Sequence, residues 1–148
     1  MAKTLQELLS EAQTLKTQIY SFLKSATYDK SDSLEGLNIN YKDPEQLLLL
    51  DEFRNITEHL GAVYQAISYL SLPIQSTSTL HLTPDGRYLT TNDGYTYTSG
   101  DLIEALVEDE YRDVPYWTLS RIEYGPDGYY IYGNKNVNLN GITVRSRK

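Results

Sequence analysis

The sequence predicts an α+β fold in which an N-terminal antiparallel two-helix hairpin is followed by a small antiparallel β-barrel or twisted sheet. Two observations predict it. In the first half, apolar residues recur every three or four positions, as they do along one face of a helix. After Pro73 this spacing gives way to short runs rich in Tyr, Thr and Val, separated by turn sequences. We therefore predict two domains, a helical hairpin over residues 1–72 and a β domain over residues 73–148.

The first helix is predicted to begin after Thr4. Thr4 and Glu7 have the spacing of a capping box, in which each residue satisfies a backbone N–H of the other. A stripe of apolar residues at helical spacing follows: Leu5, Leu8, Ala12, Leu15, Ile19, Phe22 and Ala26. We expect this stripe to form one side of the hairpin seam.

The second helix is predicted to begin at Pro44, with Asp43 as its cap, and to end before Pro73. Its apolar stripe contains Leu49, Phe53, Ile56, Leu60, Val63, Ile67 and Leu70. The two stripes can bury their seams against each other within one chain, as an antiparallel pair. Pairing with a second copy of the chain gives the same sequence pattern, so a homodimer through the hairpin is an open alternative.

The β domain is predicted from four turn sequences: Pro84-Asp85-Gly86, Asn92-Asp93-Gly94, Pro126-Asp127-Gly128 and Asn140-Gly141. They delimit expected strands at residues 79–83, 87–91, 95–99, 117–124, 129–132 and 142–145. The segment 101–107 fits a short helix or a strand, and the alternation of Ile103, Ala105 and Val107 favours a strand. Short strands with tight turns favour a small barrel or a strongly twisted sheet, because closure hides unpaired edges.

The C-terminal half resembles a known family in a scattered set of residues: Ser99-Gly100-Asp101, Ile103-Glu104, Trp117, Arg121-Ile122-Glu123, Tyr129-Tyr130, Gly133 and Leu139 to Arg145. In these residues it is similar to a small uncharacterised β-domain family carried by phages and conjugative elements of Gram-positive bacteria. The resemblance covers the last third to half of the chain. It implies a mobile-element origin and a small β-barrel fold, and it brings no established activity with it.

The usual signatures of catalysis are missing from the sequence. There is no cysteine, the only histidines are His59 and His81, and no serine lies in a Gly-x-Ser-x-Gly turn. No phosphate-binding glycine loop is present, and the aspartates of the Pro-Asp-Gly turns are explained as turn formers. We therefore expect a protein that is not an enzyme, with no cofactor and no metal site.

An acidic cluster is the strongest candidate for a partner-binding site. The chain has 20 acidic residues against 13 Lys and Arg, a net charge of −7. The cluster and the tyrosines beside it are Asp101, Glu104, Glu108, Asp109, Glu110, Tyr111, Asp113 and Tyr116. Carboxylates on a firm scaffold can imitate a phosphate backbone and bind the basic nucleic-acid-binding groove of a protein. A solvated acidic loop between strands has the same composition.

The acidic cluster, the 14 tyrosines and the resemblance to mobile-element proteins together favour a non-enzymatic interaction module. We expect an anti-CRISPR-like inhibitor of a host defence effector, acting by acidic nucleic-acid mimicry in the cytoplasm of a bacterial host. The alternative is an accessory nucleic-acid-binding protein that uses cations at and near the C-terminus: Arg121, Arg145, Arg147 and Lys148. The longest apolar run, residues 47–50, is far below the ~20 residues of a membrane span, so no membrane partner is expected.

Overall fold

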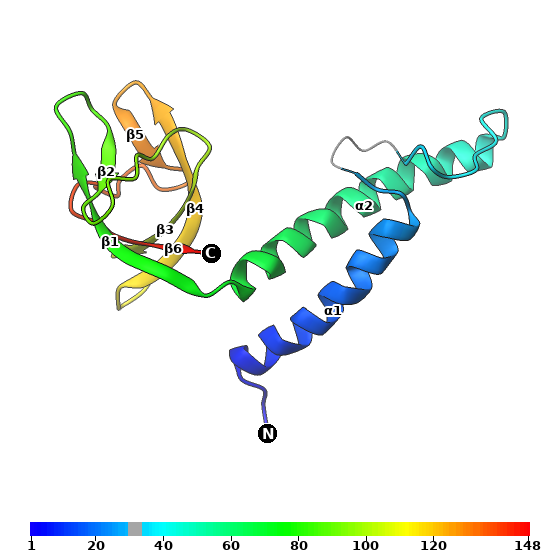
Figure 1. The fold of residues 1–148 in the computed structure, drawn as a ribbon, viewed down its shortest axis with the longest axis horizontal. Coiled ribbons are helices and arrows are strands. Elements are labelled where there is room, and N and C mark those ends of the chain that lie inside the picture. Colours follow the sequence, from blue (N-terminus) through cyan, green and yellow to red (C-terminus); the bar gives the residue numbers. More distant parts are fainter. Residues whose placement is uncertain (30–33) are drawn as a thin grey trace. The chain divides into compact units, whose positions relative to one another are not determined.

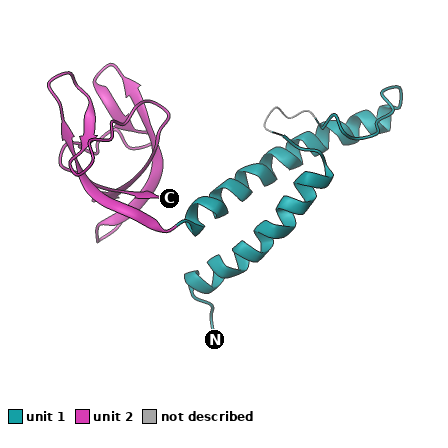
Figure 2. Cartoon of the chain, in the orientation of Figure 1, with its two compact units in different colours: residues 1–72 teal, residues 73–148 magenta. Residues whose placement is uncertain are grey.

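The computed structural model describes residues 1–29 and 34–148. They form two compact units, Met1–Leu72 and Pro73–Lys148 (Figure 2). The first unit contains two helices and the second contains six strands in one curled antiparallel sheet, a half-barrel (Figure 1). The predicted α+β class is therefore confirmed. Among the described residues, no helix combines the length and the apolar character that crossing a membrane requires.

Both helices begin where their capping residues predict. Helix α1 spans Leu5–Ser25, and the Thr4 hydroxyl accepts a hydrogen bond from the Glu7 N–H at 3.1 Å, while the Glu7 carboxylate accepts one from the Thr4 N–H at 2.7 Å. Helix α2 spans Pro44–Ser71, and the Asp43 carboxylate accepts a hydrogen bond from the Glu45 N–H at 3.0 Å. Side chains thus satisfy backbone donors that the first turns leave without partners.

The two helices contact each other along a seam that differs from the predicted stripes. The buried residues are Ile19 and Leu23 on α1 and Leu50, Thr57 and Ile67 on α2. Of the fourteen stripe residues expected there, only Ile19 and Ile67 are buried, which corrects the prediction. The apolar arc on each helix is wider than one partner helix can cover, so part of each arc faces the seam and the rest stays exposed.

The six strands of the β unit are β1 (Ile74–Leu82), β2 (Tyr88–Thr90), β3 (Leu102–Val107), β4 (Tyr116–Gly125), β5 (Gly128–Ile131) and β6 (Thr143–Arg147). Their order in the sheet is β2-β1-β6-β3-β4-β5, so the last strand of the chain lies between β1 and β3. Thr77 of β1 is paired with Arg145 of β6, and Ala105 of β3 with Val144. Every neighbouring pair in the sheet is antiparallel.

The segment 101–107 forms strand β3, as its alternation favours, whereas the strand predicted at residues 95–99 is wrong. That segment makes only one isolated bridge, between Leu89 and Thr96. The Asp101 carboxylate accepts hydrogen bonds from the Thr98 N–H at 2.9 Å and from the Tyr95 hydroxyl at 3.1 Å. These bonds hold the chain in a turn before β3, and the Asp101 side chain takes the Thr98 N–H that a strand could give to its neighbour.

The core of the β unit is formed by apolar side chains from most of its strands and two loops. The buried cluster contains Leu80, Tyr97, Ile103, Ala105, Val107, Ile122, Ile131, Leu139 and Val144. Ile103, Ala105 and Val107 share one face of β3, because side chains alternate along a strand. Glu104 is therefore on the opposite face, a placement that matters for the site.

Candidate functional site

The connection between β3 and β4 carries most of the predicted acidic cluster. Residues 108–113, here called the acidic loop, contain Glu108, Asp109, Glu110 and Asp113, and all four are exposed. Tyr111 is exposed as well, with 78% of its surface accessible. The loop lies at one end of the sheet, where β3 ends and β4 begins (Figure 1).

Asp109 anchors the acidic loop to β4. Its carboxylate accepts a hydrogen bond from the Tyr116 hydroxyl at 2.6 Å and another from the Tyr111 N–H at 2.9 Å. The Arg112 guanidinium lies 5.0 Å from the centre of the Tyr116 ring and 5.3 Å from that of Tyr111, where the ring faces attract a cation. The Asp109 carboxylate is thus engaged in holding the loop.

The other carboxylates of the acidic loop are available to a partner. Across residues 1–29 and 34–148, no hydrogen bond or ion pair holds the side chains of Glu108, Glu110 or Asp113. They sit on a loop whose backbone is fixed by Asp109, so three negative charges are presented from a defined position. Exposed charges of this kind steer a basic partner and fix its register.

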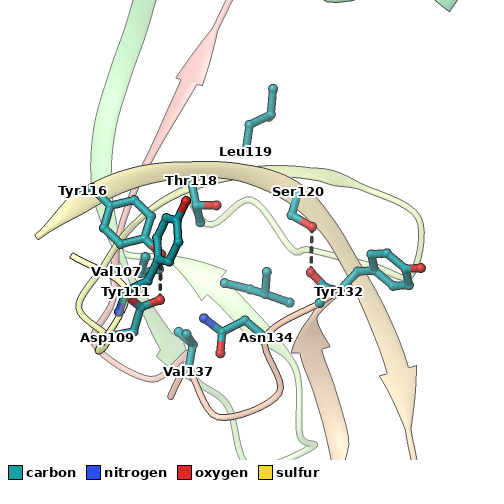
Figure 3. Close-up of a pocket in the computed structure, with 12 residues that line it drawn as sticks. Val107, Asp109, Tyr111, Tyr116, Thr118, Leu119, Ser120, Tyr132, Asn134 and Val137 are labelled. Carbon is teal, nitrogen blue, oxygen red and sulfur yellow. Dashed lines mark hydrogen bonds between the residues drawn. The ribbon is translucent and has the colours of Figure 1, made fainter.

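Two hollows, each about 330 Å³ in volume, adjoin the acidic loop and share Val107, Asp109, Asn134 and Val137 in their walls. Such volumes are at the lower end of those that bind ligands. In the first hollow, Tyr111 and Tyr116 stand at one end and Tyr132 at the other, and the Leu119 side chain points away (Figure 3). The full lining of this hollow is Val107, Asp109, Tyr111, Tyr116, Thr118, Leu119, Ser120, Ile131, Tyr132, Gly133, Asn134 and Val137.

The second hollow is lined by amides and by the start of the acidic loop. Asn134, Asn136, Asn138 and Asn140 contribute to it, together with Glu108. Neither hollow contains a histidine, lysine or arginine in its lining. Among the described residues, no three His, Asp or Glu side chains gather as metal ligands. The walls offer carboxylate and amide oxygens together with aromatic faces, a set that suits cationic and hydrogen-bonding side chains.

Glu104 does not belong to an exposed acidic surface, which corrects its assignment to the partner-binding cluster. It is only 4% exposed and lies opposite Arg145 of β6 in the register. Its carboxylate accepts hydrogen bonds from Arg145 at 2.8 Å and from Arg147 at 3.1 Å. A carboxylate that is almost fully buried requires such partners, because desolvation alone would be costly.

Asp101 is also separated from the acidic loop. It lies at the opposite end of β3, where it is half-buried and holds the turn before the strand. Its carboxylate accepts a hydrogen bond from the Tyr95 hydroxyl, and burial followed by this bond raises the pKa of Tyr95. Of the eight predicted partner-binding residues, the structure therefore brings six together, in the acidic loop and at Tyr116.

The cations of the alternative nucleic-acid-binding site do not form one exposed platform. Arg145 and Arg147 bind Glu104, and the Arg145 guanidinium lies 4.1 Å from the Trp117 ring centre. Arg121 pairs with Glu123 at 2.6 Å and stacks on Tyr132 at 3.7 Å. Only Lys148 of the predicted set is exposed without an ion pair among the described residues. This corrects the expectation for Arg145 and Arg147, because their charges are used inside the unit.

Several residues that complete the hollows were not predicted from the sequence, chiefly Thr118, Ser120, Tyr132, Asn134 and Val137. Ser120 donates a hydrogen bond to the Tyr132 carbonyl at 2.9 Å, which holds the chain after β5 beside β4. The run of asparagines between residues 134 and 140 was the available signal, since alternate amides without a helical or strand pattern mark a structured loop.

The contact between Tyr116 and Asp109 is expected to be sensitive to pH. The hydrogen bond to the Asp109 carboxylate, followed by desolvation, raises the pKa of Tyr116 above its ordinary value. The neutral phenol is thus the form that the folded loop favours. The contribution of this hydrogen bond to folding stability is fully present below the ordinary phenol pKa. It is lost as the pH rises through the raised pKa of Tyr116.

Asp109→Ala should lower the pKa of Tyr116 towards its ordinary value, because the acceptor is removed. The measurement is a titration of tyrosinate absorbance on the full chain. The chain has 14 tyrosines, so the titration of the same chain carrying Tyr116→Phe is subtracted to isolate the signal of Tyr116. Asp113→Ala is the control, since Asp113 makes no hydrogen bond to Tyr116. An equal shift in both aspartate variants would contradict the role of the hydrogen bond.

Comparison with known proteins gives one family match. No curated protein and no solved structure matches the chain. The matched residues, 78–146, lie wholly within the β unit and cover a little under half of the chain. The acidic loop and both hollows fall inside the match, and the helices fall outside it. The C-terminal half is therefore similar to a small domain family without an assigned activity, the family described as Domain of unknown function (DUF5348).

Proposed function

We propose that the β unit is a non-enzymatic protein-interaction module that binds a basic segment of a partner protein at the acidic loop. The observation that carries the proposal is a set of three carboxylates, Glu108, Glu110 and Asp113. They have no cation partner among residues 1–29 and 34–148, and they sit on a loop anchored by Asp109. The net charge of −7 adds long-range attraction for a cationic surface.

The two hollows supply the short-range part of the proposed recognition. Each has room for one or two side chains, and Tyr111 and Tyr116, whose rings the Arg112 guanidinium already contacts, add aromatic surface to the first. Asp109 contributes to the walls of both hollows. A basic, extended segment can therefore lie along the acidic loop with side chains in each hollow.

The class of partner follows from the charge. A protein whose basic groove ordinarily binds nucleic acid, such as a CRISPR effector, carries cations at the spacing of phosphates and is the partner that we propose. The acidic loop holds four of the six carboxylates predicted for this surface, because Asp101 and Glu104 serve the fold. Mimicry is thus assigned to the acidic loop alone.

We also infer that α1 and α2 act as one antiparallel hairpin. The inference is supported by contacts that run in opposite order along the two helices: Gln13 with Ser71, Tyr20 with Tyr64, and Phe22 with Phe53. A hairpin of this kind is a rigid element through which the chain can make further contacts.

The test is a binding measurement with a labelled arginine-rich peptide as the probe, by fluorescence anisotropy on the full chain. The triple variant Glu108→Lys, Glu110→Lys, Asp113→Lys should bind roughly 100-fold more weakly, because three attractive charges become repulsive. Asp109 is kept, since it anchors the loop. The matched control reverses Glu35, Glu52 and Glu58, three exposed acids of the helical unit, with the same change in net charge.

The outcomes separate a site from a general effect of charge. Binding that is weakened in the acidic-loop variant and nearly unchanged in the control supports the proposal. Equal weakening in both variants would sink it, because net charge alone would then explain the affinity. Labelled single-stranded DNA is the second probe: tight binding that falls steeply with salt and requires Arg121 and Lys148 would favour the nucleic-acid-binding alternative.

A further inference from the structure

The helix pair leaves an apolar stripe uncovered on α1. Leu8, Leu15 and Phe22 follow one another at intervals of seven residues, which places them almost directly above one another on the helix. They are 40–53% exposed. The buried residues Ile19 and Leu23 lie to one side of this stripe, so the stripe flanks the seam with α2 and does not belong to it.

Helix α2 carries a longer stripe of the same kind. Leu49, Ile56, Val63 and Leu70 also repeat every seven residues and are 43–47% exposed. A strict seven-residue apolar repeat is the pattern of a helix seam that packs against another helix. Here the residues that α2 buries are Leu50, Thr57 and Ile67, and of these only Ile67 borders the stripe. The stripe is therefore a second seam that the first unit does not fill.

The two stripes lie on the same side of the helix pair. The rings of Phe22 and Phe53 are 6.5 Å apart, and Phe53 lies between the buried edge of α2 and its exposed stripe. On the far side of α2 from the stripe, Asp51, Asn55 and Glu58 are exposed polar residues. The helix pair thus has one broad apolar face and one polar face.

We infer that a second copy of the chain covers this face, so that two helix pairs form a four-helix bundle. At ~1.5 Å per residue, Leu49 to Leu70 spans about 32 Å and Leu8 to Phe22 about 21 Å, and each helix is about 10 Å wide. The face is then about 530 Å² per chain, or about 1,060 Å² for two chains, which clears the ~1,000 Å² expected of a biological interface.

The width of the apolar face indicates that a second helix pair, and not a single helix, covers it. One added helix is about 10 Å wide and covers only one of the two stripes. A second helix pair has the required width, the same length and the same seven-residue repeat, and a two-fold dimer sets each stripe against its equivalent or its neighbour. None of the seven stripe residues carries a charge that such burial would leave unpaired.

The experiment is sedimentation velocity on the full chain over a range of concentrations. The wild-type protein should have a mass near twice 16.9 kDa. The double variant Ile56→Glu, Val63→Glu should have the mass of one chain, while helical circular dichroism reports that the helices remain. Ala62→Glu with Gln65→Glu adds the same two charges at exposed positions of α2 outside the stripe and should remain a dimer.

A milder variant keeps the inference testable if the charged variant loses its helices. The chain has no cysteine, so Val63→Cys introduces one thiol into the stripe. Its alkylation should be slow where the protein is dimeric and fast on dilution. A wild-type monomer at every concentration would overturn the inference. A dimer that survives Ile56→Glu, Val63→Glu would overturn it as well.

Discussion

Glu104→Gln is expected to destabilise the β unit by about 3–5 kcal/mol, the cost of removing one partner from a buried ionic cluster. Glu104 is the carboxylate that the structure places between Arg145 and Arg147, at 2.8 and 3.1 Å. The two guanidinium groups are largely buried, with 17% and 13% of their side chains exposed. Glutamine keeps the shape and loses the charge, so both cations would stay in a poorly solvated place with less compensation.

Urea unfolding, followed by the fluorescence of the single tryptophan, Trp117, measures this loss in the unit that contains the cluster. Glu108→Gln is the matched control, because it removes the same charge from an exposed residue just beyond β3 and should change stability by less than ~0.5 kcal/mol. Equal effects of the two substitutions would contradict the stabilising role of the cluster.

Replacing all three charged residues tests whether the ionic cluster itself stabilises the fold. In the other case, only the removal of one partner is costly, because it leaves unpaired charges buried. The triple variant Glu104→Leu, Arg145→Leu, Arg147→Met leaves no unpaired charge, and it should recover most of what Glu104→Gln loses. The long apolar replacements also keep contact with Trp117, on which Arg145 stacks at 4.1 Å.

Ile122→Ala is the second substitution for which we expect a large loss, about 2–5 kcal/mol. Ile122 is 1% exposed and faces Ile131 across β4 and β5. Its backbone also joins β4 to the turn before β3, since its N–H donates to the Asp101 carbonyl at 2.8 Å and its carbonyl accepts from Gly100 at 2.7 Å. Truncation leaves a cavity among strands that several bonds hold in place, so the cavity cannot easily collapse.

The same tryptophan fluorescence measures the loss, and Leu119→Ala on the same strand is the control. Leu119 is 44% exposed, so its truncation should cost under ~1 kcal/mol. Far-ultraviolet circular dichroism follows the helices of the other unit, whose transition should move little in Ile122→Ala. A shift of both transitions by the same amount would mean that the two units unfold together.

Local signals explain why much of the fold was predictable. The capping box at Thr4 and the Asp43-Pro44 start act within one helical turn, so their residues are readable without knowledge of the rest of the chain. The Pro126-Asp127-Gly128 turn is similar: Gly128 has a φ of 102°, which a side chain would oppose, and the hairpin of β4 and β5 forms around it.

The predictions that were wrong concern residues whose environment is set by residues far away in the sequence. Which part of a wide apolar arc faces the other helix depends on the partner, so Leu50 and Thr57 were missed as seam residues. Glu104 was grouped with its acidic neighbours, whereas its environment is set by Arg145, 41 residues later. Asp101 pulls Tyr95 and Thr98 into a turn, which a pattern of alternating strand residues does not reveal.

The candidate site also has one part that could be predicted from the sequence and one that could not. The acids of residues 108–113 and the tyrosines beside them are contiguous, and composition alone marks them as a candidate surface. The hollows depend on Asn134 and Val137, which reach β4 only after β5 has turned the chain back. A binding surface made from two separate segments is visible only once the sheet has brought them together.

The position of β6 between β1 and β3 governs the order in which the chain can fold during synthesis. The sheet cannot close until residues 143–147 have emerged from the ribosome, because Val144 pairs with both Ser78 and Ala105. The helices are made first and close shorter loops, so they can pair early. For the time needed to translate the second half, β1 and β3 lack their shared neighbour, and their open edges are available to chaperones or to other nascent chains.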